Sequence, residues 1–159
     1  MATDHLIKNI TLREMRAGDE ASIEEFFDAL DPVSTALFNR RGYNKRGALR
    51  FCAKGDPHRR YWIAELDGRM AGYVFFLDFH TSIPELGVAV RSDLQGQGLG
   101  KHLVEFAIST AADCGKGGIQ LTTHVANLRA QTLYETLGFV CMGSCKNGTE
   151  LFYLYRFVE

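Results

Sequence analysis

The first third of the chain alternates between short extended and helical spacings of apolar residues. A short strand is expected near residues 10–15, and apolar residues recur at helical spacing over 23–30. The Asp31-Pro32 pair ends that helix, because the residue before a proline disfavours the helical conformation. Residues 33–56 are mixed, and they predict one or two short helices and a loop.

The middle of the chain has the pattern of strands. Residues 61–66 and 70–79 are rich in β-branched and aromatic side chains, and the Asp67-Gly68 pair between them supplies the positive φ angles that a tight hairpin turn requires. Residues 85–90 are almost continuously apolar after the first position, as expected for a strand covered on both faces.

A strand, a helix and a second strand follow one another in the next segment. The spacing predicts a buried helix over about 98–113 and a strand over 118–126, so a right-handed crossover makes the strands at 85–90 and 118–126 parallel. Asn127 then suits the N-cap of another helix, which Gly138 ends.

Two last strands, 139–143 and 150–158, are expected to pair antiparallel across the Asn147-Gly148 turn. The aromatic strand at 150–158 fits either a buried internal strand or an edge that pairs across a homodimer. The whole pattern predicts one α+β domain over residues 1–159, built around a mixed sheet.

Composition and charge narrow the class of protein. Apolar residues make up 46% and charged residues 23%, which fits a folded globular domain, and the formal net charge of −1 gives no global field toward nucleic acid or a membrane. One local basic group fits either a contact with an acidic partner or a solvated helix face: Arg40, Arg41, Lys45, Arg46 and Arg50.

The four cysteines form no CxxC pair, and the histidines are not spaced as metal ligands beside them, so no metal site is expected. A reduced, cytoplasmic protein fits this cysteine usage. The N-terminus has no basic region followed by an apolar run, and no segment approaches the roughly 20 apolar residues that span a bilayer. Cys141 and Cys145 are expected to be buried thiols rather than nucleophiles.

The most informative stretch is RSDLQGQGLGK, residues 91–101, where a strand passes into a helix through three glycines. Backbone N–H groups at such a helix start bind anions, and the glycines leave room for phosphate oxygens. A P-loop does not fit, because Gln95 stands where its first glycine belongs and His102 replaces the hydroxyl residue. A dinucleotide fingerprint fails too, because its third glycine falls at Lys101.

What remains is Gln-x-x-Gly-x-Gly, formed by Gln95, Gly98 and Gly100 directly after a strand. The sequence NLRAQTLYETLGF, residues 127–139, follows it as a second motif. Together they resemble the pyrophosphate loop and the Asn-to-Phe helix of the GNAT N-acetyltransferase superfamily. The resemblance implies a mostly antiparallel mixed sheet with a splayed central parallel strand pair and flanking helices.

The resemblance also implies acetyl-CoA as the cosubstrate, with its pantetheine arm between the two parallel strands and its pyrophosphate on the glycine loop. A backbone N–H of residues 88–90 would hold the oxyanion. The cofactor-binding residues expected on this basis are Val88, Ala89, Val90, Gln95, Gly96, Gln97, Gly98, Leu99, Gly100, Lys101, Asn127 and Tyr134.

Two residues are expected to be catalytic. Tyr134 matches the family tyrosine that protonates the departing thiolate, although its position on an amphipathic helix also fits plain core. Glu85 starts the central strand where some relatives carry a glutamate that acts through water as general base, and a solvated strand-end carboxylate is the other interpretation. Other members carry a glutamate base near the position of Thr122, so that version of the base is absent here, and His124 could replace or relay the base.

The resemblance therefore predicts direct transfer of an acetyl group to a primary amine, in a small molecule or at a protein lysine or N-terminus. Residues 26–56 and 79–83 are expected to form the acceptor groove. The alternative is a catalytically silent acyl-CoA-binding regulatory domain on the same fold, because a fold does not guarantee turnover.

Overall fold

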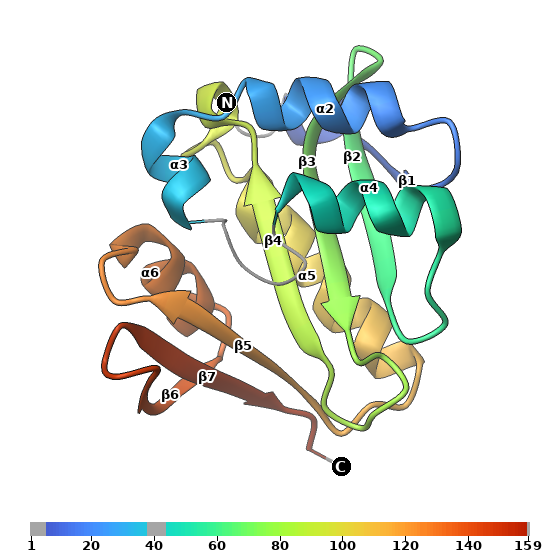
Figure 1. Ribbon diagram of the computed structural model, residues 1–159. Coiled ribbons are helices and arrows are strands. Elements are labelled where there is room, and N and C mark those ends of the chain that lie inside the picture. Colours follow the sequence, from blue (N-terminus) through green and yellow to red (C-terminus); the bar gives the residue numbers. More distant parts are fainter. Residues whose placement is uncertain (1–5, 38–43, 159) are drawn as a thin grey trace.

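The computed structural model describes residues 6–37 and 44–158 (Figure 1). Its strands form one seven-stranded sheet in the order β1-β2-β3-β4-β5-β7-β6. Among the strands of the described residues, only the β4–β5 pair is parallel, which confirms the mixed, mostly antiparallel sheet. The strands are β1 Thr11–Glu14, β2 Arg60–Leu66, β3 Arg69–Leu77, β4 Glu85–Val90, β5 Gly118–His124, β6 Val140–Cys145 and β7 Glu150–Arg156.

The sheet separates two hydrophobic cores. One core packs α5 and α6 against β3, β4, β5 and β7, whereas the other packs α2 and α4 against β2 and β3. Figure 1 shows α2 and α4 lying across the front of the sheet, with α5 behind it. The helices are α2 Glu20–Asp28, α3 Pro32–Leu37, α4 Lys45–Lys54, α5 Leu99–Asp113 and α6 Leu128–Thr136, with the short 3₁₀ turn η1 at Ser92–Leu94.

The hairpin and the early helices follow the sequence pattern. Asp67 and Gly68 have φ angles of 54° and 75°, which confirms the tight turn between β2 and β3. Helix α2 ends before Asp31 as expected, but Pro32 is also the first residue of α3. Proline is favoured at that position because its missing N–H has no helical partner there, so the pair that ends one helix starts the next.

The β4, α5 and β5 elements form the expected parallel crossover. Strand β4 is apolar on both faces because Leu86, Val88 and Val90 enter the core under α5, while Ala89 faces the core under α2 and α4. Helix α5 begins at Leu99, immediately after Gly98, which has a left-handed φ of 88°.

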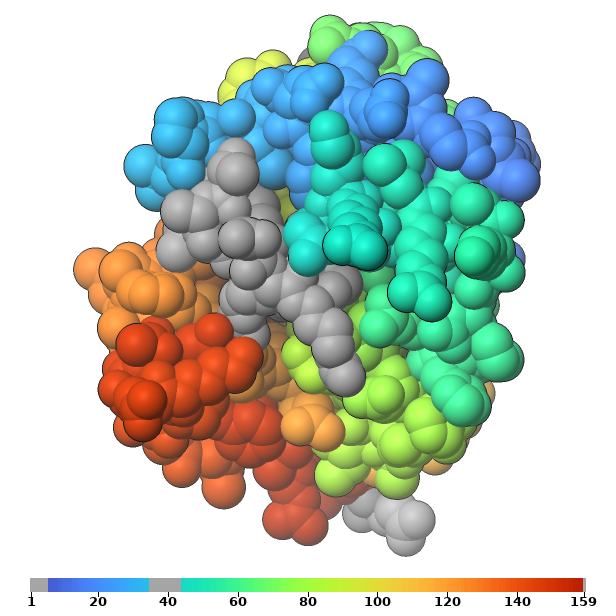
Figure 2. Space-filling model, in the orientation of Figure 1, coloured from blue at the N-terminus to red at the C-terminus, as the bar shows by residue number. Residues whose placement is uncertain are grey.

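The C-terminal strands settle the open question about residues 150–158. Strand β7 pairs with β5 on one side and with β6 on the other, so it is an internal strand and not a dimer edge. Strand β6 is the outer strand and is largely exposed; Figure 2 shows this red surface at the lower left. The expectation that Cys141 is buried is therefore wrong, because it lies on this exposed strand, and Cys145 is only half-buried.

Three of the five residues in the local basic group lie within the described residues. Lys45, Arg46 and Arg50 are exposed on α4, as expected for a solvated helix face, and Arg40 and Arg41 lie outside the described residues. Within the described ranges, no helix combines the length and hydropathy needed to cross a membrane.

Candidate active site

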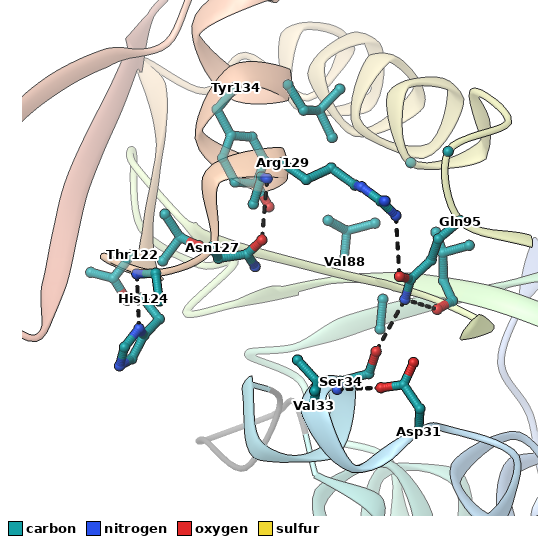
Figure 3. Close-up of a pocket in the computed structure, with 18 residues that line it drawn as sticks. Asp31, Val33, Ser34, Val88, Gln95, Thr122, His124, Asn127, Arg129 and Tyr134 are labelled. Atoms are coloured by element: carbon teal, nitrogen blue, oxygen red, sulfur yellow. Dashed lines mark hydrogen bonds between the residues drawn. The ribbon is translucent and has the colours of Figure 1, made fainter. Parts of the chain in front are cut away.

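The two parallel strands separate along their length and leave a cavity between them. Within β4 and β5, which are both fully described, the register contains one pair, Glu85 with Gln120, at the start of β4. Further along, the register between β4 and β5 contains no further pair, and residues Val88–Val90 and Thr122–His124, which pair with β3 and β7 on their other sides, line a cavity of about 370 Å³ (Figure 3). Backbone groups that face such a gap need a hydrogen-bonding partner, so the cavity suits an amide-rich ligand.

The glycine turn lies at one end of this cavity. Gly96 and Gly98 have φ angles of 79° and 88°, and a Cβ at Gly96 would meet no atom within 4 Å. The N-terminus of α5, a helix of 15 residues, follows at once, and its N-cap Gly98 has no side chain to cover the first N–H groups. This arrangement favours an anion such as a pyrophosphate.

The other residues expected around this turn divide into two groups. Gln95, Gly96 and Gly100 line the cavity. The Leu99 side chain is buried in the core, and that of Lys101 is exposed. The side chain of Gln97 is outside the cavity lining and donates to the carbonyl of Asp93 at 3.4 Å.

Gln95 joins three elements around the cavity. Its Nε2 donates to the carbonyl oxygen of Val90 at 3.1 Å and to the Oγ of Ser34 at 3.2 Å, and its Oε1 accepts from Arg129 at 3.3 Å. Figure 3 shows Gln95 between Ser34 on α3 and Arg129 on α6. Ser34 and Arg129 were not expected from the sequence, and Arg129 places a guanidinium near the glycine turn.

Asp31 and Ser34 form the start of α3 at the cavity rim. The Asp31 carboxylate accepts from the Ser34 N–H at 2.6 Å, and the Asp31 N–H donates to Ser92 Oγ at 3.0 Å. The pKa of Asp31 lies below its ordinary value, mainly because of the backbone N–H of Ser34 and then because of that residue's side chain. The rim therefore carries a negative charge on the α3 side.

Asn127 occupies the expected N-cap of α6 and also lines the cavity. Its Oδ1 accepts from the Ala130 N–H at 3.3 Å. The cap uses the oxygen, so both interpretations of Asn127 are compatible: the amide nitrogen is the group placed for a ligand.

Tyr134 has one side in the core and one side on the cavity. Its residue is 4% exposed, and its ring lies 5.6 Å from the ring of Phe139 and 6.1 Å from that of Tyr153. It lines the cavity opposite α3, as Figure 3 shows. The core interpretation of Tyr134 and its place on the cavity are therefore compatible.

Glu85 lies apart from these residues. It is half-buried at the start of β4, opposite Gln120, and is not among the described residues that line the cavity. Strand alternation turns its side chain to the same face as Ala89, toward α2 and α4.

His124 lines the cavity at the end of β5. Its Nδ1 accepts from the Ala126 N–H at 3.0 Å, so the proton of the neutral ring is on Nε2. Nδ1 is therefore occupied and is not placed to act as a base. Figure 3 shows the ring extending toward the side of the cavity on which Ser34 lies. Among the described residues, no group of three or more His, Cys, Asp or Glu side chains is arranged to hold a metal ion.

A parallel strand pair that opens beside a glycine turn at a helix start, with a tyrosine lining the gap, is the arrangement that the resemblance to the GNAT superfamily implies. The model of the Acetyltransferase (GNAT) family matches residues 23–139. This chain belongs to the GNAT family and is an enzyme of the acyltransferase class.

Relatives and solved structures agree with this placement. The L-amino acid N-acyltransferase MnaT of Escherichia coli is 28% identical over 137 residues, covering 82% of this chain and 80% of its own. The N-alpha-acetyltransferase 30 of Saccharomyces cerevisiae is 36% identical over 89 residues, 56% of this chain and 40% of its own length. The ribosomal-protein-S5-alanine acetyltransferase of Vibrio fischeri has the same fold, with a TM-score of 0.79 at 16% identity, over 93% of both chains.

Proposed function

We propose that this protein is an acetyl-CoA-dependent N-acetyltransferase that transfers the acetyl group directly to a primary amine. The observation that carries the proposal is the cavity between β4 and β5, which joins the glycine turn at Gly96 to Tyr134. A single elongated ligand with an anionic end and a reactive end fits such a site.

The residues present fit acetyl-CoA. The open space at Gly96 and the start of α5 would hold the pyrophosphate, with Arg129 as a nearby cation. Backbone groups of Val88–Val90 would pair with the pantetheine amides, much as an added strand pairs with a sheet edge. Acetyl-CoA supplies the acetyl group as a thioester.

Tyr134 is the proposed general acid. In the transfer, the amine nitrogen forms a bond to the acetyl carbon, the carbon–sulfur bond breaks, the amine loses one proton and the thiolate gains one from the Tyr134 hydroxyl. No acyl-enzyme is needed, so no cysteine nucleophile is required.

An α-amino group with a pKa near 8 must lose a proton before it attacks, which costs about 1.4 kcal/mol at pH 7 without help, against about 4.6 kcal/mol for an alkylamine with a pKa near 10.4. Glu85 is the proposed base and acts through water, because its side chain lies on the face of β4 that α5 does not cover. A Glu85→Gln variant should lower kcat/KM most at low pH, where less free amine is present; an unchanged pH profile would remove Glu85 from the mechanism.

The acceptor is proposed to carry an α-amino group. MnaT is named for L-amino acids and N-alpha-acetyltransferase 30 for α-amino groups, and MnaT is matched over most of both chains. His124 supports this choice, because its Nε2–H can donate to the carbonyl or carboxylate oxygen that stands beside an α-amino group. The four free thiols support a reducing compartment such as the cytoplasm.

Free-thiol release from acetyl-CoA tests the proposal against the silent acyl-CoA-binding alternative. Wild-type protein should release CoA with amino acids or peptides, and Tyr134→Phe should lower kcat by about 10²-fold or more while acetyl-CoA still raises the Tm. Tyr155→Phe, on the same α6 side of the sheet, is the matched control and should keep the activity. A Tm increase without thiol release for any amine would favour the silent domain.

A further inference from the structure

Tyr153 connects the sheet to the helix that carries Tyr134. It lies in the middle of β7, opposite Leu121 on β5 and Cys141 on β6, and is 1% exposed. Its hydroxyl donates to Oε2 of Glu135 at 2.7 Å. Glu135 is the residue after Tyr134 on α6, so this bond attaches the helix to β7 one residue away from the proposed acid.

The rings around Tyr134 constrain its position less strictly than a short hydrogen bond does. Its ring lies between Tyr153, at 6.1 Å and 50°, and Phe139, at 5.6 Å and 59°. Phe139 in turn contacts Tyr155 at 5.2 Å. Such tilted contacts stabilise a layer of rings but tolerate sliding, whereas a short hydrogen bond to a carboxylate has a fixed length and direction.

We propose that Tyr153, through its hydrogen bond to Glu135, is a positioning residue that holds the Tyr134 hydroxyl at the place where the thiolate leaves. This inference rests on the proposed function, in which Tyr134 donates the proton. A displacement of about 1 Å in a reacting group can cost about 10²-fold in rate, so a bond that sets the position of α6 matters for turnover.

Tyr153 is not itself the acid. It is not among the described residues that line the cavity. Burial and the neighbouring Glu135 carboxylate raise the pKa of Tyr153, so its hydroxyl stays protonated and remains a donor to Glu135 at all working pH values.

Three substitutions separate the bond from the packing. Tyr153→Phe removes the hydroxyl, keeps the ring and leaves behind only the exposed Glu135 carboxylate, which water can solvate. Glu135→Ala removes the acceptor and leaves the buried Tyr153 hydroxyl without it, so the stability of this variant is measured beside its kcat. Both should lower kcat by about 10- to 100-fold with an unchanged Kd for acetyl-CoA, because Asn127 and the glycine turn are untouched. Glu135→Gln keeps an oxygen acceptor and should restore most of the activity.

A double-mutant cycle with Tyr134→Phe decides between positioning and general structural support. If Tyr153 acts through Tyr134, then Tyr153→Phe lowers kcat in the wild-type background and changes nothing in the Tyr134→Phe background. Equal losses in both backgrounds, a parallel loss of acetyl-CoA affinity, or no loss in either background overturns the inference.

The same measurements show which role fails: the transferase activity, the acid role of Tyr134 or the positioning role of Tyr153. No thiol release by the wild type with any amine overturns the proposed function and, with it, this inference. A wild-type rate that Tyr134→Phe leaves unchanged removes the acid assignment and the inference but keeps the transferase. If Tyr134→Phe lowers kcat and Tyr153→Phe does not, the positioning role of Tyr153 is wrong and the proposed function stands.

Discussion

The side-chain amide of Gln95 donates to the carbonyl oxygen of Val90 at 3.1 Å, which folds the loop after β4 back onto the end of that strand. The same amide group reaches Ser34 and Arg129, so one side chain connects the strand, α3 and α6 at the mouth of the cavity. The shape of the cavity mouth therefore depends on a residue that also belongs to the loop motif.

Replacing Gln95 should weaken acetyl-CoA binding. Gln95→Ala removes three hydrogen bonds at the cavity mouth. If this weakens the free energy of acetyl-CoA binding by about 1 kcal/mol, the Kd should rise about 5- to 10-fold. Gln97→Ala is the matched control, because its side chain lies outside the cavity lining and its backbone N–H is kept. Titration calorimetry measures both, and equal Kd values for the two variants would contradict the role of Gln95.

A negative charge in the glycine turn should abolish cofactor binding. Gly96 and Gly115 both have positive φ angles, 79° and 73°, and a Cβ at either site meets no atom within 4 Å. Gly96→Glu and Gly115→Glu therefore carry similar backbone strain, but only the first places a carboxylate at the proposed pyrophosphate site. Acetyl-CoA at 100 times its Kd should stabilise wild type and Gly115→Glu by about 2.7 kcal/mol and leave Gly96→Glu unchanged. Thermal unfolding with and without acetyl-CoA tests this, and a normal Tm shift in Gly96→Glu would place the anion elsewhere.

Acid should remove the stabilisation that Asp19 provides. Burial alone would raise the pKa of Asp19, but hydrogen bonds from the Arg13 guanidinium, at 2.7 and 2.9 Å, and from the Arg16 N–H, at 2.8 Å, bring the net pKa below its ordinary value. A carboxyl whose folded pKa is lowered stabilises the fold above its unfolded pKa of about 3.9, and this contribution is lost as the pH falls through the lower, folded value.

Asp19→Asn should therefore cost about 2 kcal/mol at pH 7, and the difference from wild type should shrink as the pH falls below about 4. Urea unfolding at a series of pH values measures the difference. Asp113→Asn, at an exposed position, is the control and should match wild type throughout. A difference that stays constant down to pH 3 would mean that the Asp19 pKa is not lowered.

Gly87 should not tolerate a side chain. A Cβ at this position would overlap the ring of Phe75, which is fully buried on the neighbouring strand. Gly87→Ala should therefore destabilise the fold by about 1 to 3 kcal/mol, and adding Phe75→Leu should recover part of the loss. Gly100→Ala is the comparison, because its Cβ would lie at an ordinary 3.5 Å from Leu133 and a helical glycine gains up to about 1 kcal/mol as alanine. Equal stabilities of the two alanine variants would show that the Phe75 ring can move away at little cost.

The parts of the fold that depend on interactions between residues close in sequence were largely predictable. The Asp67-Gly68 hairpin, the parallel crossover through α5 and the Asn127 cap follow from turn propensity, periodicity and capping. The place of β7 was not predictable, because insertion between β5 and β6 depends on which strand edge is left open in three dimensions. Pro32 shows the same limit at short range, since one residue can end a helical pattern and also begin the next helix.

The residues of the two sequence motifs were the part of the cavity lining that could be predicted. Gln95, Gly96 and Gly100 line the cavity, as do Asn127 and Tyr134. Ser34 and Arg129 were missed because their contact with Gln95 joins α3, α6 and a loop that are far apart in the sequence. The hydrogen bond that occupies His124 Nδ1 depends on the turn after β5, which no spacing rule describes. The catalytic roles of Tyr134 and Glu85 remain predictions.

The position of β7 has a consequence for synthesis of the chain. Its residues leave the ribosome after β5, α6 and β6, yet they must enter between β5 and β6 and pair with both. Until they arrive, the outer edge of β5 is open and the ring of Tyr134 lacks Tyr153 beneath it. Domains are made at about 5 to 20 residues per second, so a nascent chain passes through a brief interval in which the glycine turn has been synthesised and the strand that completes the sheet beside Tyr134 has not.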